Sequence, residues 1–492
     1  MSAQRFPTVF TDPLTSASGF LEDLTTPTLR LGVTGLSRAG KTVFITSLVH
    51  CLLSARPKPP LRVISRLPRF RAYLQPQPDD DVARFAYEGH LAALTGPNPT
   101  WPEGTRHVSQ LRLTFEWAAS DTARQLVGLN RRLNIDIIDY PGEWLIDLAM
   151  LDQTFAEWSR DALLLAKQAP RSPETEALLA FVKDTPPTFA ADEGKAIEGA
   201  KLFHDHLSAL RNRDGLRGLI GPGRFLLPGD LAGSPLLTFY PLKFTQETDK
   251  AKAGSHHALL EKRFESYKTH VVKPFFERHF ARIDRQIVLV DALHAINAGA
   301  EGLRELEHGL AGVLKAFRPG ANSWLSLLLG RRIDRIAFAV SKADHLHHTS
   351  HSKLEALLKQ VVSRAQQRAH GAGATTTSVA LAALRSTKDV EKQERGKTYH
   401  CLSGAPVAGS ILDGRTYDGL RQRVVFPGDL PDDPLAAFDP DVCGPEHFQF
   451  VDFAPPQLAQ ALDAQDAITA GPDWPHIGLD RLLAFMVEDY LT

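Results

Sequence analysis

The sequence of 492 residues has few cysteines and almost no net charge. Its three cysteines, Cys51, Cys401 and Cys443, lack the spacing of a metal site. So sparse a set favours a reducing compartment over a disulfide scaffold. A formal net charge of −1 argues against an overall attraction to nucleic acid or acidic lipid.

The sequence also lacks long apolar runs. No uninterrupted apolar stretch reaches the roughly 18 residues of a membrane-spanning helix. The start of the chain carries acidic residues and does not resemble a signal peptide. We therefore expect a cytoplasmic protein that binds no nucleic acid and that meets a membrane only through a partner.

The first part of the chain predicts strands around a glycine-rich segment. Residues 29–33 alternate as in a strand, and residues 41–53 form an apolar helical stretch after the glycines. Residues 56–104 are rich in proline and charge, and we interpret them as a long excursion. Two further strands are predicted at 108–117 and 133–139.

Helical patterns replace the strands from residue 144 to about residue 284. The pattern predicts helices over 144–167, 174–183 and 191–211, interrupted by proline and glycine. We interpret this region as a helical insertion into the fold.

Short apolar strands return after the insertion. Residues 286–290, 333–340 and 377–382 are continuous apolar runs, which are typical of strands buried on both faces. Their alternation with helices predicts an α/β fold with a mostly parallel sheet covered on both sides. Beyond residue 395, strand-like pieces at 398–402, 423–426 and 448–453 indicate a small β-rich appendage. The predicted divisions are 1–143 and 285–395 for the two parts of the α/β domain, 144–284 for the insertion, 396–476 for the appendage and 477–492 for a closing helix.

The glycine-rich segment, residues 35–42 (GLSRAGKT), matches the phosphate-binding pattern G-x-x-x-x-G-K-[ST] between a strand and a helix. Glycines let successive backbone N–H groups face a β-phosphate, and the helix N-terminus adds its dipole. Lys41 would reach the β- and γ-phosphates, and the Thr42 hydroxyl would bind Mg²⁺. The alternative is a glycine-rich turn with an incidental lysine. The residues assigned to the nucleotide here are Gly35, Ser37, Arg38, Ala39, Gly40, Lys41, Thr42 and Val43.

Asp139 ends a predicted strand and stands three residues before Gly142. We expect Asp139 to hold Mg²⁺ through water, and the Gly142 N–H to contact the γ-phosphate. D-x-x-G alone is weak, because such turns are common, but its place after the phosphate loop favours function. Glu143 stands where many GTPases have a water-positioning glutamine. A carboxylate beside a γ-phosphate is a poor base, so Glu143 receives no role.

Residues 341–344 (Ser-Lys-Ala-Asp) resemble the base-reading motif [NT]-K-x-D. Asp344 would accept hydrogen bonds from guanine N1–H and N2–H₂, and adenine lacks that donor pair. The Lys342 stem would lie over the base, and the Ser341 hydroxyl could tie back to the phosphate loop. Ala382 and Ala383, after the last predicted strand, could offer backbone N–H groups to the base. The alternative is a lysine–aspartate pair on a solvated loop.

The switch threonine has to precede the strand at 108–117. Thr105 sits correctly, and Thr95 and Thr100 are rivals. The predicted metal ligands are Thr42, Thr105 and Asp139. The predicted catalytic residues are Arg38, Lys41 and Thr105.

Four histidines, His345, His347, His348 and His351, follow the base-reading motif and raise the question of a metal site. The neighbouring sequence offers no carboxylate to support them. Solvated or helix-capping histidines are therefore the favoured interpretation.

Several of these segments together resemble the YcjX family of bacterial P-loop GTPase-like stress proteins. They are LGVTGLSRAGKTVFITSL at 31–48, DYPGEWL at 139–145, LPGDLAG at 227–233, RQIVLVD at 285–291, SKAD at 341–344 and IGLDRLLAF at 477–485. The resemblance implies a Ras-like core with a helical insertion and an inner-membrane protein partner. Ser341 stands where the family favours threonine.

The phosphate loop is also similar to that of guanylate-binding proteins, in which an arginine at the position of Arg38 acts as an internal finger when G domains pair. This similarity implies a homodimer through the G domain. The alternative is an Arg38 that pairs outward with a surface carboxylate. The sequence as a whole favours a slow, Mg²⁺-dependent GTPase that switches a partner in a bacterial stress response. A nucleotide-bound scaffold without hydrolysis and an ATPase are the alternatives.

Overall fold

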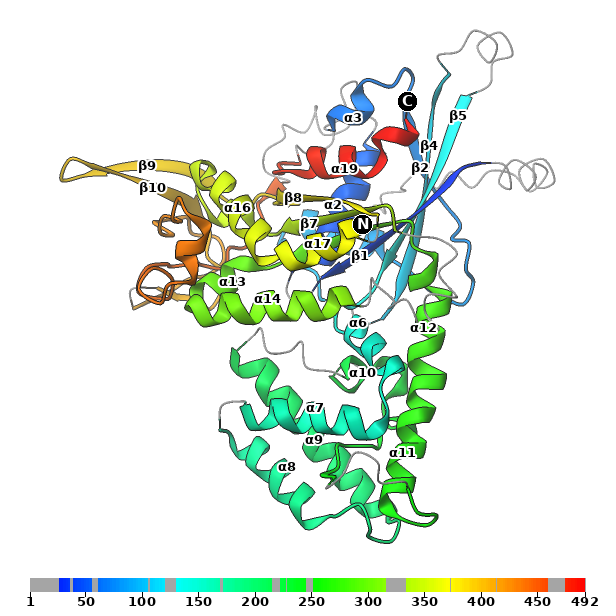
Figure 1. The fold of residues 1–492 in the computed structure, drawn as a ribbon. Helices are drawn as coiled ribbons and strands as arrows, with labels where there is room; N and C mark the ends of the chain where they lie inside the picture. Colours follow the sequence, from blue (N-terminus) through cyan, green and yellow to red (C-terminus); the bar gives the residue numbers. More distant parts are fainter. Residues whose placement is uncertain are drawn as a thin grey trace.

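Eight strands form the central sheet of this computed structural model, in the order β2-β4-β5-β1-β6-β7-β8, with β3 paired to β4 beside that path (Figure 1). The strands are β1 (Thr28–Gly35), β2 (Arg71–Gln75), β3 (Ala83–Arg84), β4 (Ser109–Ala118), β5 (Asn130–Asp139), β6 (Arg285–Val290), β7 (Arg335–Val340) and β8 (Thr375–Ala380). The structure describes residues 26–35, 39–54, 61–104, 107–119, 130–168, 171–214, 222–226, 228–244, 251–315, 333–371, 373–412, 414–458 and 474–491.

Strands β5, β1, β6, β7 and β8 run parallel, whereas β4 pairs antiparallel with β5 and with β2. The α/β fold with a mostly parallel sheet is therefore confirmed. The carboxyl ends of the five parallel strands meet at one edge. The interpretation of residues 56–104 as an excursion was wrong in part, because β2 and β3 lie within it and extend the sheet. Strand β2 is only partly buried, so it carries no strong apolar signal.

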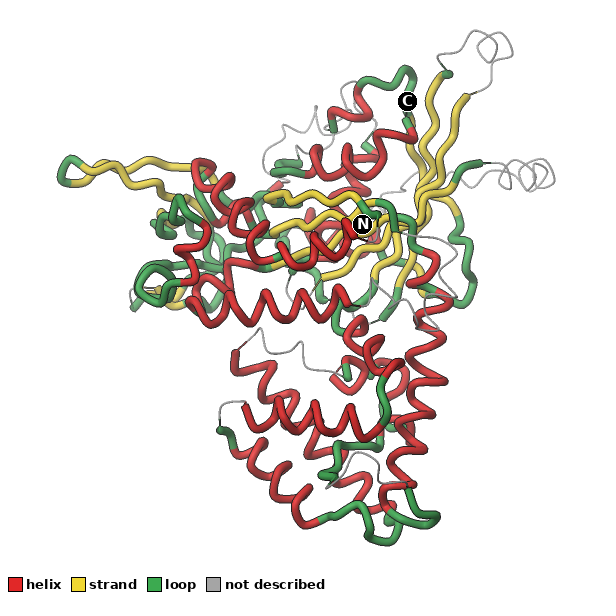
Figure 2. Tube along the Cα trace, viewed as in Figure 1, coloured by secondary structure: helices red, strands yellow, loops and turns green. Residues whose placement is uncertain are grey.

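Helices cover both faces of the sheet (Figures 1 and 2). On one face, α2 (Lys41–Leu53) and α19 (Leu479–Val487) share a core with Ile287 and Leu289 of β6. On the other face, Val288 and Val290 join the core of four further helices. These helices are α13 (Ala292–Asn297), α14 (Gly299–Lys315), α16 (His351–Val361) and α17 (Ser363–Gly371). Successive residues of β6 thus enter opposite cores, which explains its unbroken apolar run.

The chain between β5 and β6 forms a separate helical layer. This layer lies below the sheet in Figure 1. Its main helices are α6 (Trp144–Asp147), α7 (Phe155–Gln168), α8 (Pro173–Asp184), α9 (Glu193–Asp214), α10 (Gly223–Leu226), α11 (His256–Tyr267) and α12 (Lys273–Arg278). Its core is rich in aromatic rings. Trp158 packs edge-on against Phe203 and Phe239, with ring centroids 5.7 and 5.3 Å away.

The single helix predicted over 144–167 is wrong. A 3₁₀ turn, Leu148–Asp152, follows α6, and α7 begins anew at Phe155. The sequence held a signal for this second start. The Thr154 N–H donates to Glu157 Oε2 at 2.8 Å, and the Glu157 N–H donates to the Thr154 hydroxyl at 3.2 Å. This reciprocal pair is a capping box.

The appendage is built around a hairpin of β9 (Lys388–Glu394) and β10 (Lys397–Gly404). Strand β13 (Arg423–Val425) joins β10, and β11 (Ile411–Leu412) pairs with β12 (Arg415–Thr416). Residues 448–453, predicted as a strand, form only an isolated bridge between Phe453 and Pro406. The division predicted after residue 395 falls in the hairpin turn, where Arg395 and Gly396 have φ of 51° and 77°. We propose that the appendage begins with β9.

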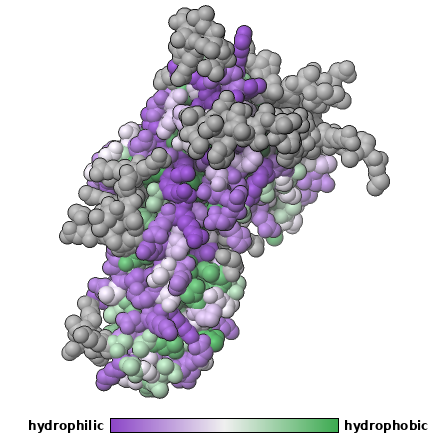
Figure 3. Space-filling model, turned by 90° about the vertical axis from the view of Figure 1, so that its right-hand side faces the viewer, coloured by the Kyte–Doolittle hydropathy of each residue, from purple (hydrophilic) through white to green (hydrophobic). Residues whose placement is uncertain are grey.

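The surface is mixed in polarity. Apolar side chains stand exposed on the helical insertion, among them Leu164, Leu165 and Ile197. Figure 3 shows apolar patches among hydrophilic ones over the lower part of the molecule. No helix among the described residues is long and apolar enough to cross a membrane.

A buried ion pair across β4 and β5 provides a test of the sheet. Arg112 lies opposite Asp136, its Nε donates to Asp136 Oδ1 at 2.6 Å, and the Asp136 side chain is 0% exposed. We expect Arg112→Met to destabilise the protein by about 3–5 kcal/mol, because it strands a buried carboxylate. The double variant Arg112→Met/Asp136→Leu should recover much of that loss. Urea unfolding midpoints measure both.

The matched control is Arg84→Ala, because Arg84 pairs with Glu88 on the surface, where both side chains are exposed. Its effect should stay below about 1 kcal/mol. A double variant no more stable than Arg112→Met would contradict the account of a buried charge.

Candidate functional site

A cavity of about 620 Å³ opens where the parallel strands end. In open α/β sheets, ligands bind outside the carboxyl ends of the strands. Three separate regions of the chain line the cavity: residues 39–44 at the start of α2, residues 341–345 after β7, and residues 381–386 after β8. Trp101, Pro102 and Gly104 close one side, and the appendage adds Val407, Asp452 and Phe453.

The predicted phosphate loop leads from β1 into α2. Gly40 precedes the helix with φ of 77°, a left-handed conformation that favours glycine. Lys41 is buried, and its Nζ donates to the Gly35 carbonyl oxygen at 3.3 Å. This bond draws the lysine back across the loop, toward the place that a β-phosphate takes in such loops. Residues 39–43 line the cavity. Ser37 and Arg38 lie outside the described residues.

Asp139 is the last residue of β5 and is buried beside β1, where it lies opposite Val33. Three residues later, the Gly142 N–H donates to the Gly35 carbonyl oxygen at 3.3 Å. A Cβ on Gly142 would lie 2.8 Å from that oxygen, so no larger residue fits without a shift. The D-x-x-G loop and the phosphate loop are therefore in direct backbone contact.

Thr105, the predicted switch threonine, lies outside the described residues, but the segment before it is placed. The Thr42 hydroxyl donates to the Glu103 carbonyl oxygen at 3.2 Å. Trp101 Nε1 donates to the Phe453 carbonyl oxygen at 2.7 Å. Residues 101–104 thus lie over Thr42 and connect it to the appendage. Thr95, one of the rivals, is used within α4 (Tyr87–Thr95), where its hydroxyl donates to the Leu91 carbonyl oxygen.

The base-reading loop after β7 is held by partners far away in sequence. Asp344 is 3% exposed, and its Oδ2 accepts from both the N–H and the hydroxyl of Ser386, each at 2.8 Å. Lys342 has a left-handed φ of 59°, and its Nζ donates to Asp291 Oδ2 at 2.7 Å. Because a carboxylate has several acceptor positions, Asp344 can still accept from a ligand in the cavity.

One of the predicted contacts in this region is wrong, and another stays a prediction. The Ser341 hydroxyl donates to the Val290 carbonyl oxygen at 3.3 Å, on the neighbouring strand. Its predicted tie to the phosphate loop stays a prediction, because residues 36–38 of that loop lie outside the described residues. The Ala382 N–H donates to the Ile477 carbonyl oxygen at 3.0 Å, so it is already used. Ala383 does line the cavity, and its carbonyl oxygen accepts from Trp474 Nε1 at 3.1 Å.

Sequence reasoning missed three residues of the site. Asp291 comes directly after β6, much as Asp139 ends β5, and this parallel was a usable signal. Ser386 lies in the loop after β8, where a hydroxyl near the predicted N–H donors could have been considered. Phe453 offered no signal, because its place depends on how the appendage folds back. Its ring lies edge-on to His345, with the centroids 5.3 Å apart.

The helical insertion is attached directly behind the D-x-x-G loop. Asp147 in α6 accepts from the Gly223 N–H at 2.6 Å and from the Tyr267 hydroxyl at 2.6 Å. Burial raises the pKa of Asp147 to about 6. The Arg224 guanidinium lies over the Trp144 ring, 3.8 Å from its centroid. A displacement of residues 142–144 would therefore pull on α10 and α11.

Comparison with known proteins agrees with this architecture. The model of the YcjX-like family, DUF463, matches residues 29–491. The chain belongs to the YcjX-like family. One relative of this YcjX-like chain, from Shewanella oneidensis, is called "Ras-like GTPase YcjX" and is 34% identical over 482 residues, covering 94% of each chain. A relative with the same name from Escherichia coli K12 is 35% identical over 474 residues, covering 94% of this chain and 96% of its own.

The glycine contact in this YcjX-like protein can be tested directly. We expect Gly142→Ala to weaken binding of a GTP analogue roughly tenfold or more. The added Cβ would displace the Gly142 N–H from its proposed γ-phosphate partner, and a charge-assisted hydrogen bond is worth about 1.5–3 kcal/mol. GDP affinity should change little, since GDP lacks the γ-phosphate that Gly142 is expected to contact. Fluorescent nucleotide titrations measure both affinities.

Gly104→Ala is the matched control, because a Cβ on Gly104 meets nothing within 4 Å although the residue lines the same cavity. It should bind both nucleotides normally. If Gly142→Ala weakens GDP as much as the GTP analogue, the contact serves only to shape the loop.

Proposed function

We propose that this YcjX-like protein binds GTP and GDP with Mg²⁺, hydrolyses GTP slowly and acts as a nucleotide-state switch. The observation that carries the proposal is the pairing of Asp344 with Ser386 in a cavity whose other end is the phosphate loop. The pairing orients a buried carboxylate toward the position of a base. The printed names of the two relatives support the same activity.

Guanine is favoured over adenine by hydrogen-bond complementarity. Guanine presents two N–H donors that a single carboxylate can accept, whereas adenine would turn an acceptor toward it. Lys342, held by Asp291, would lay its stem along the base, and the Ala383 N–H is the remaining backbone donor proposed for it. This difference counts against the alternative of an ATPase.

The phosphate end suits Mg²⁺, which prefers hard oxygen ligands and keeps several waters. The Thr42 hydroxyl, the Asp139 carboxylate through water, and Thr105 are the proposed ligands. When bound, the ion would neutralise charge on the β- and γ-phosphates. Lys41 would leave the Gly35 carbonyl to reach the same oxygens, and the Gly142 N–H would exchange Gly35 for the γ-phosphate.

We expect hydrolysis to be slow because of the groups that could activate an attacking water in the cavity. Glu143 lines the cavity and is 3% exposed, yet a carboxylate beside a γ-phosphate is a poor base. Arg38 remains the proposed internal finger, and a partner copy of the G domain would be needed to turn it inward. A turnover assay with and without Mg²⁺ distinguishes the proposed enzyme from the alternative, a scaffold without hydrolysis. Only an enzyme releases phosphate in a Mg²⁺-dependent way.

The cellular side of the proposal rests on the family resemblance alone. It comprises a role in a bacterial stress response, a cytoplasmic location at the inner membrane and a membrane-protein partner. Comparing proteins captured by the GTP-analogue form and by the GDP form would test it.

The base contact gives a sharp prediction. Asp344→Asn replaces an acceptor with a donor and should favour xanthine nucleotides over guanine nucleotides by roughly tenfold or more. Competition between XDP and GDP measures the change. The control is Asp452→Asn, since Asp452 lines the cavity but is largely exposed. An unaltered preference for GDP in Asp344→Asn would show that Asp344 does not contact the base.

The switch proposal predicts a change in hydrogen exchange. A γ-phosphate that draws Gly142 away from Gly35 should shift α6, and Asp147 should pass the shift to residues 222–226. We expect exchange at residues 139–168 and 222–226 to differ between the GTP-analogue and GDP forms. In Asp147→Asn the difference should persist at 139–143 and fade at 222–226.

Asp205→Ala serves as the control for this variant, because Asp205 is a half-exposed residue of α9 away from the loop. Its exchange pattern should match that of the unmodified protein. Identical exchange in both nucleotide states of the unmodified protein would refute the switch.

A further inference from the structure

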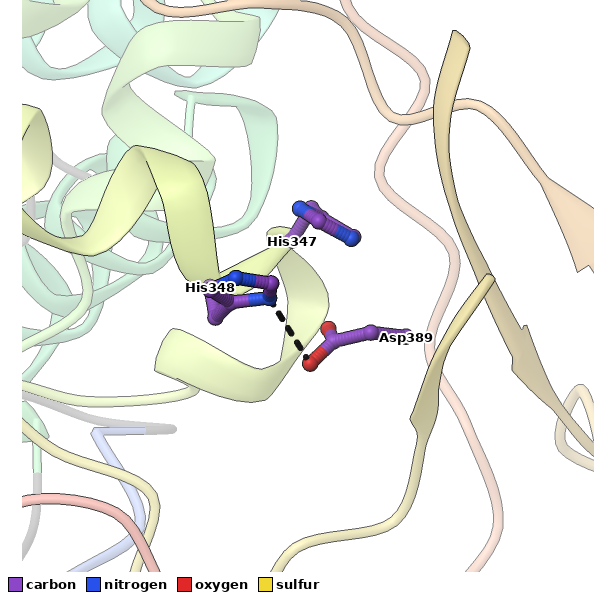
Figure 4. Close-up of side chains that lie close together, drawn as sticks. All are labelled: His347, His348 and Asp389. Carbon is purple, nitrogen blue, oxygen red and sulfur yellow. Dashed lines mark hydrogen bonds and ion pairs between the residues drawn. The ribbon is translucent and has the colours of Figure 1, made fainter. Parts of the chain in front are cut away.

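The histidines that follow the base-reading loop divide into two groups. His351 Nε2 contacts the carbonyl oxygens of Ala343 and Leu346, at 2.9 and 3.2 Å, and His345 packs on Phe453. These two have structural roles, although the sequence had favoured solvated or helix-capping histidines and His345 is buried. His347 and His348 instead face the hairpin of the appendage, where they meet the carboxylate of Asp389 that the local sequence could not reveal (Figure 4).

We propose that His347, His348 and Asp389 bind a divalent cation of the Zn²⁺ class. One ligand atom from each of the three residues lies within 4.8 Å of the others. His348 Nδ1 and Asp389 Oδ2 are 3.2 Å apart. Ligand atoms of a tetrahedral Zn²⁺ site, with bonds of about 2.0–2.1 Å, are separated by roughly 3.3 Å. One edge of the site therefore already has the required length, and His347 needs to move by about 1.5 Å.

The burial and hydrogen bonding of His347 suit a metal ligand. His347 is 2% exposed, and its Nδ1 lies 3.0 Å from the Thr349 hydroxyl. With the proton on Nδ1, that N–H would donate a hydrogen bond to the hydroxyl oxygen and leave Nε2 available as a ligand. A longer contact of 3.5 Å from the Thr349 N–H to Nδ1 would then be lost.

Asp389 supplies an independent observation. Its Oδ1 is buried and has no hydrogen-bond partner among the described residues, although Oδ2 is bound to both His348 and Arg385. A buried carboxylate oxygen without a partner is costly and calls for an explanation such as a bound ion.

The hairpin brings further ligating groups to the same face. Glu391 follows Asp389 by two residues on β9, and His400 lies opposite Glu391 on β10. Side chains at such positions share one face of the hairpin. The His400 ring stacks on that of His347, with centroids 4.8 Å apart and planes at 17°. His400 or a water would complete a four-coordinate site. Among the described residues, Arg385 is the arginine or lysine in contact with the site, with its Nη2 2.9 Å from Asp389 Oδ2.

A cation here would connect the hairpin to the base-reading loop. His347 follows Asp344 by three residues, and Asp389 follows Ser386 by three residues. The ion would thus close a second link behind the Asp344–Ser386 pair. It is distinct from the Mg²⁺ site, because imidazoles favour Zn²⁺ and related ions, whereas Mg²⁺ favours oxygen ligands.

Cobalt titration tests the proposal on the full chain. After treatment with a chelator, the protein should bind about one Co²⁺ per chain with the visible absorption of a tetrahedral site, and Zn²⁺ should displace it. His348→Ala and Asp389→Asn should each weaken binding roughly 100-fold, since losing even an outer-shell partner costs 10–100-fold. His348 is exposed and Asp389 keeps its shape as asparagine, and equal melting temperatures in chelator check folding.

Three controls separate a metal site from other roles. His204→Ala removes another histidine beside a carboxylate, 3.5 Å from Asp205, and should bind Co²⁺ normally. Arg385→Ala removes the opposing charge and should bind as well or more tightly. If Asp389 only served its ion pair, both Arg385→Ala and Asp389→Asn would behave alike. Lys41→Ala should also bind Co²⁺ normally, so failure of the nucleotide proposal and of this one remain distinguishable. The absence of tetrahedral absorption, or undiminished binding in His348→Ala and Asp389→Asn, overturns the site.

Discussion

The contact between Gly35 and Gly142 is the constraint on which the rest of the site depends. It holds the ends of β1 and β5 so close that a Cβ on Gly142 would lie 2.8 Å from the Gly35 carbonyl oxygen. On the other side of β1, a Cβ on Gly35 would lie 2.7 Å from the carbonyl oxygen of Leu289 in β6. At Gly35 and Gly142, strands β1 and β5 thus bring bare backbone to the place where the proposed nucleotide would put its phosphates. The same carbonyl oxygen accepts from Lys41, so one atom holds both groups that the proposed nucleotide would take over.

The two accessory parts of the chain attach to the loops around this contact. The insertion follows Gly142 after one residue and is held through Asp147 and the Trp144–Arg224 stack. The appendage reaches the opposite side of the cavity, where the Phe453 carbonyl oxygen binds Trp101 and its ring lies on His345. If the Gly142 N–H exchanged the Gly35 carbonyl oxygen for a γ-phosphate, as proposed, the insertion would therefore move first. The proposed cation would hold the appendage against the base-reading loop. The insertion would thus respond to the phosphate end of the nucleotide, and the appendage to the base end.

The local patterns predicted most of the fold and the three motifs of the site. Two kinds of pattern act over only a few residues: the apolar runs of β6, β7 and β8, and the glycines around Lys41. The sequence alone therefore predicted these elements. The capping box at Thr154 was equally local but was overlooked, which extended the first insertion helix wrongly. Strand β2 escaped detection because it is partly exposed and lies among prolines and charges.

The remaining features depend on contacts between distant residues. Ser386 lies 42 residues from Asp344, and Asp291 lies 51 residues from Lys342, so no spacing rule pairs them. The same reason explains why the local sequence showed no carboxylate beside the histidines. Asp389 reaches them only because the β9–β10 hairpin folds back onto the base-reading loop.

The central claim is that the cavity reads guanine, and competition binding tests it most directly. The unmodified protein, with Mg²⁺ and a fluorescent GDP, is titrated with unlabelled GDP, GTP and ATP. The account predicts that GDP and GTP displace the probe at concentrations at least roughly 100-fold below those needed for ATP, because a buried acceptor left unpaired costs about 1–3 kcal/mol and the opposed adenine acceptor adds to it. Displacement by ATP at the same concentration as GTP would contradict the account.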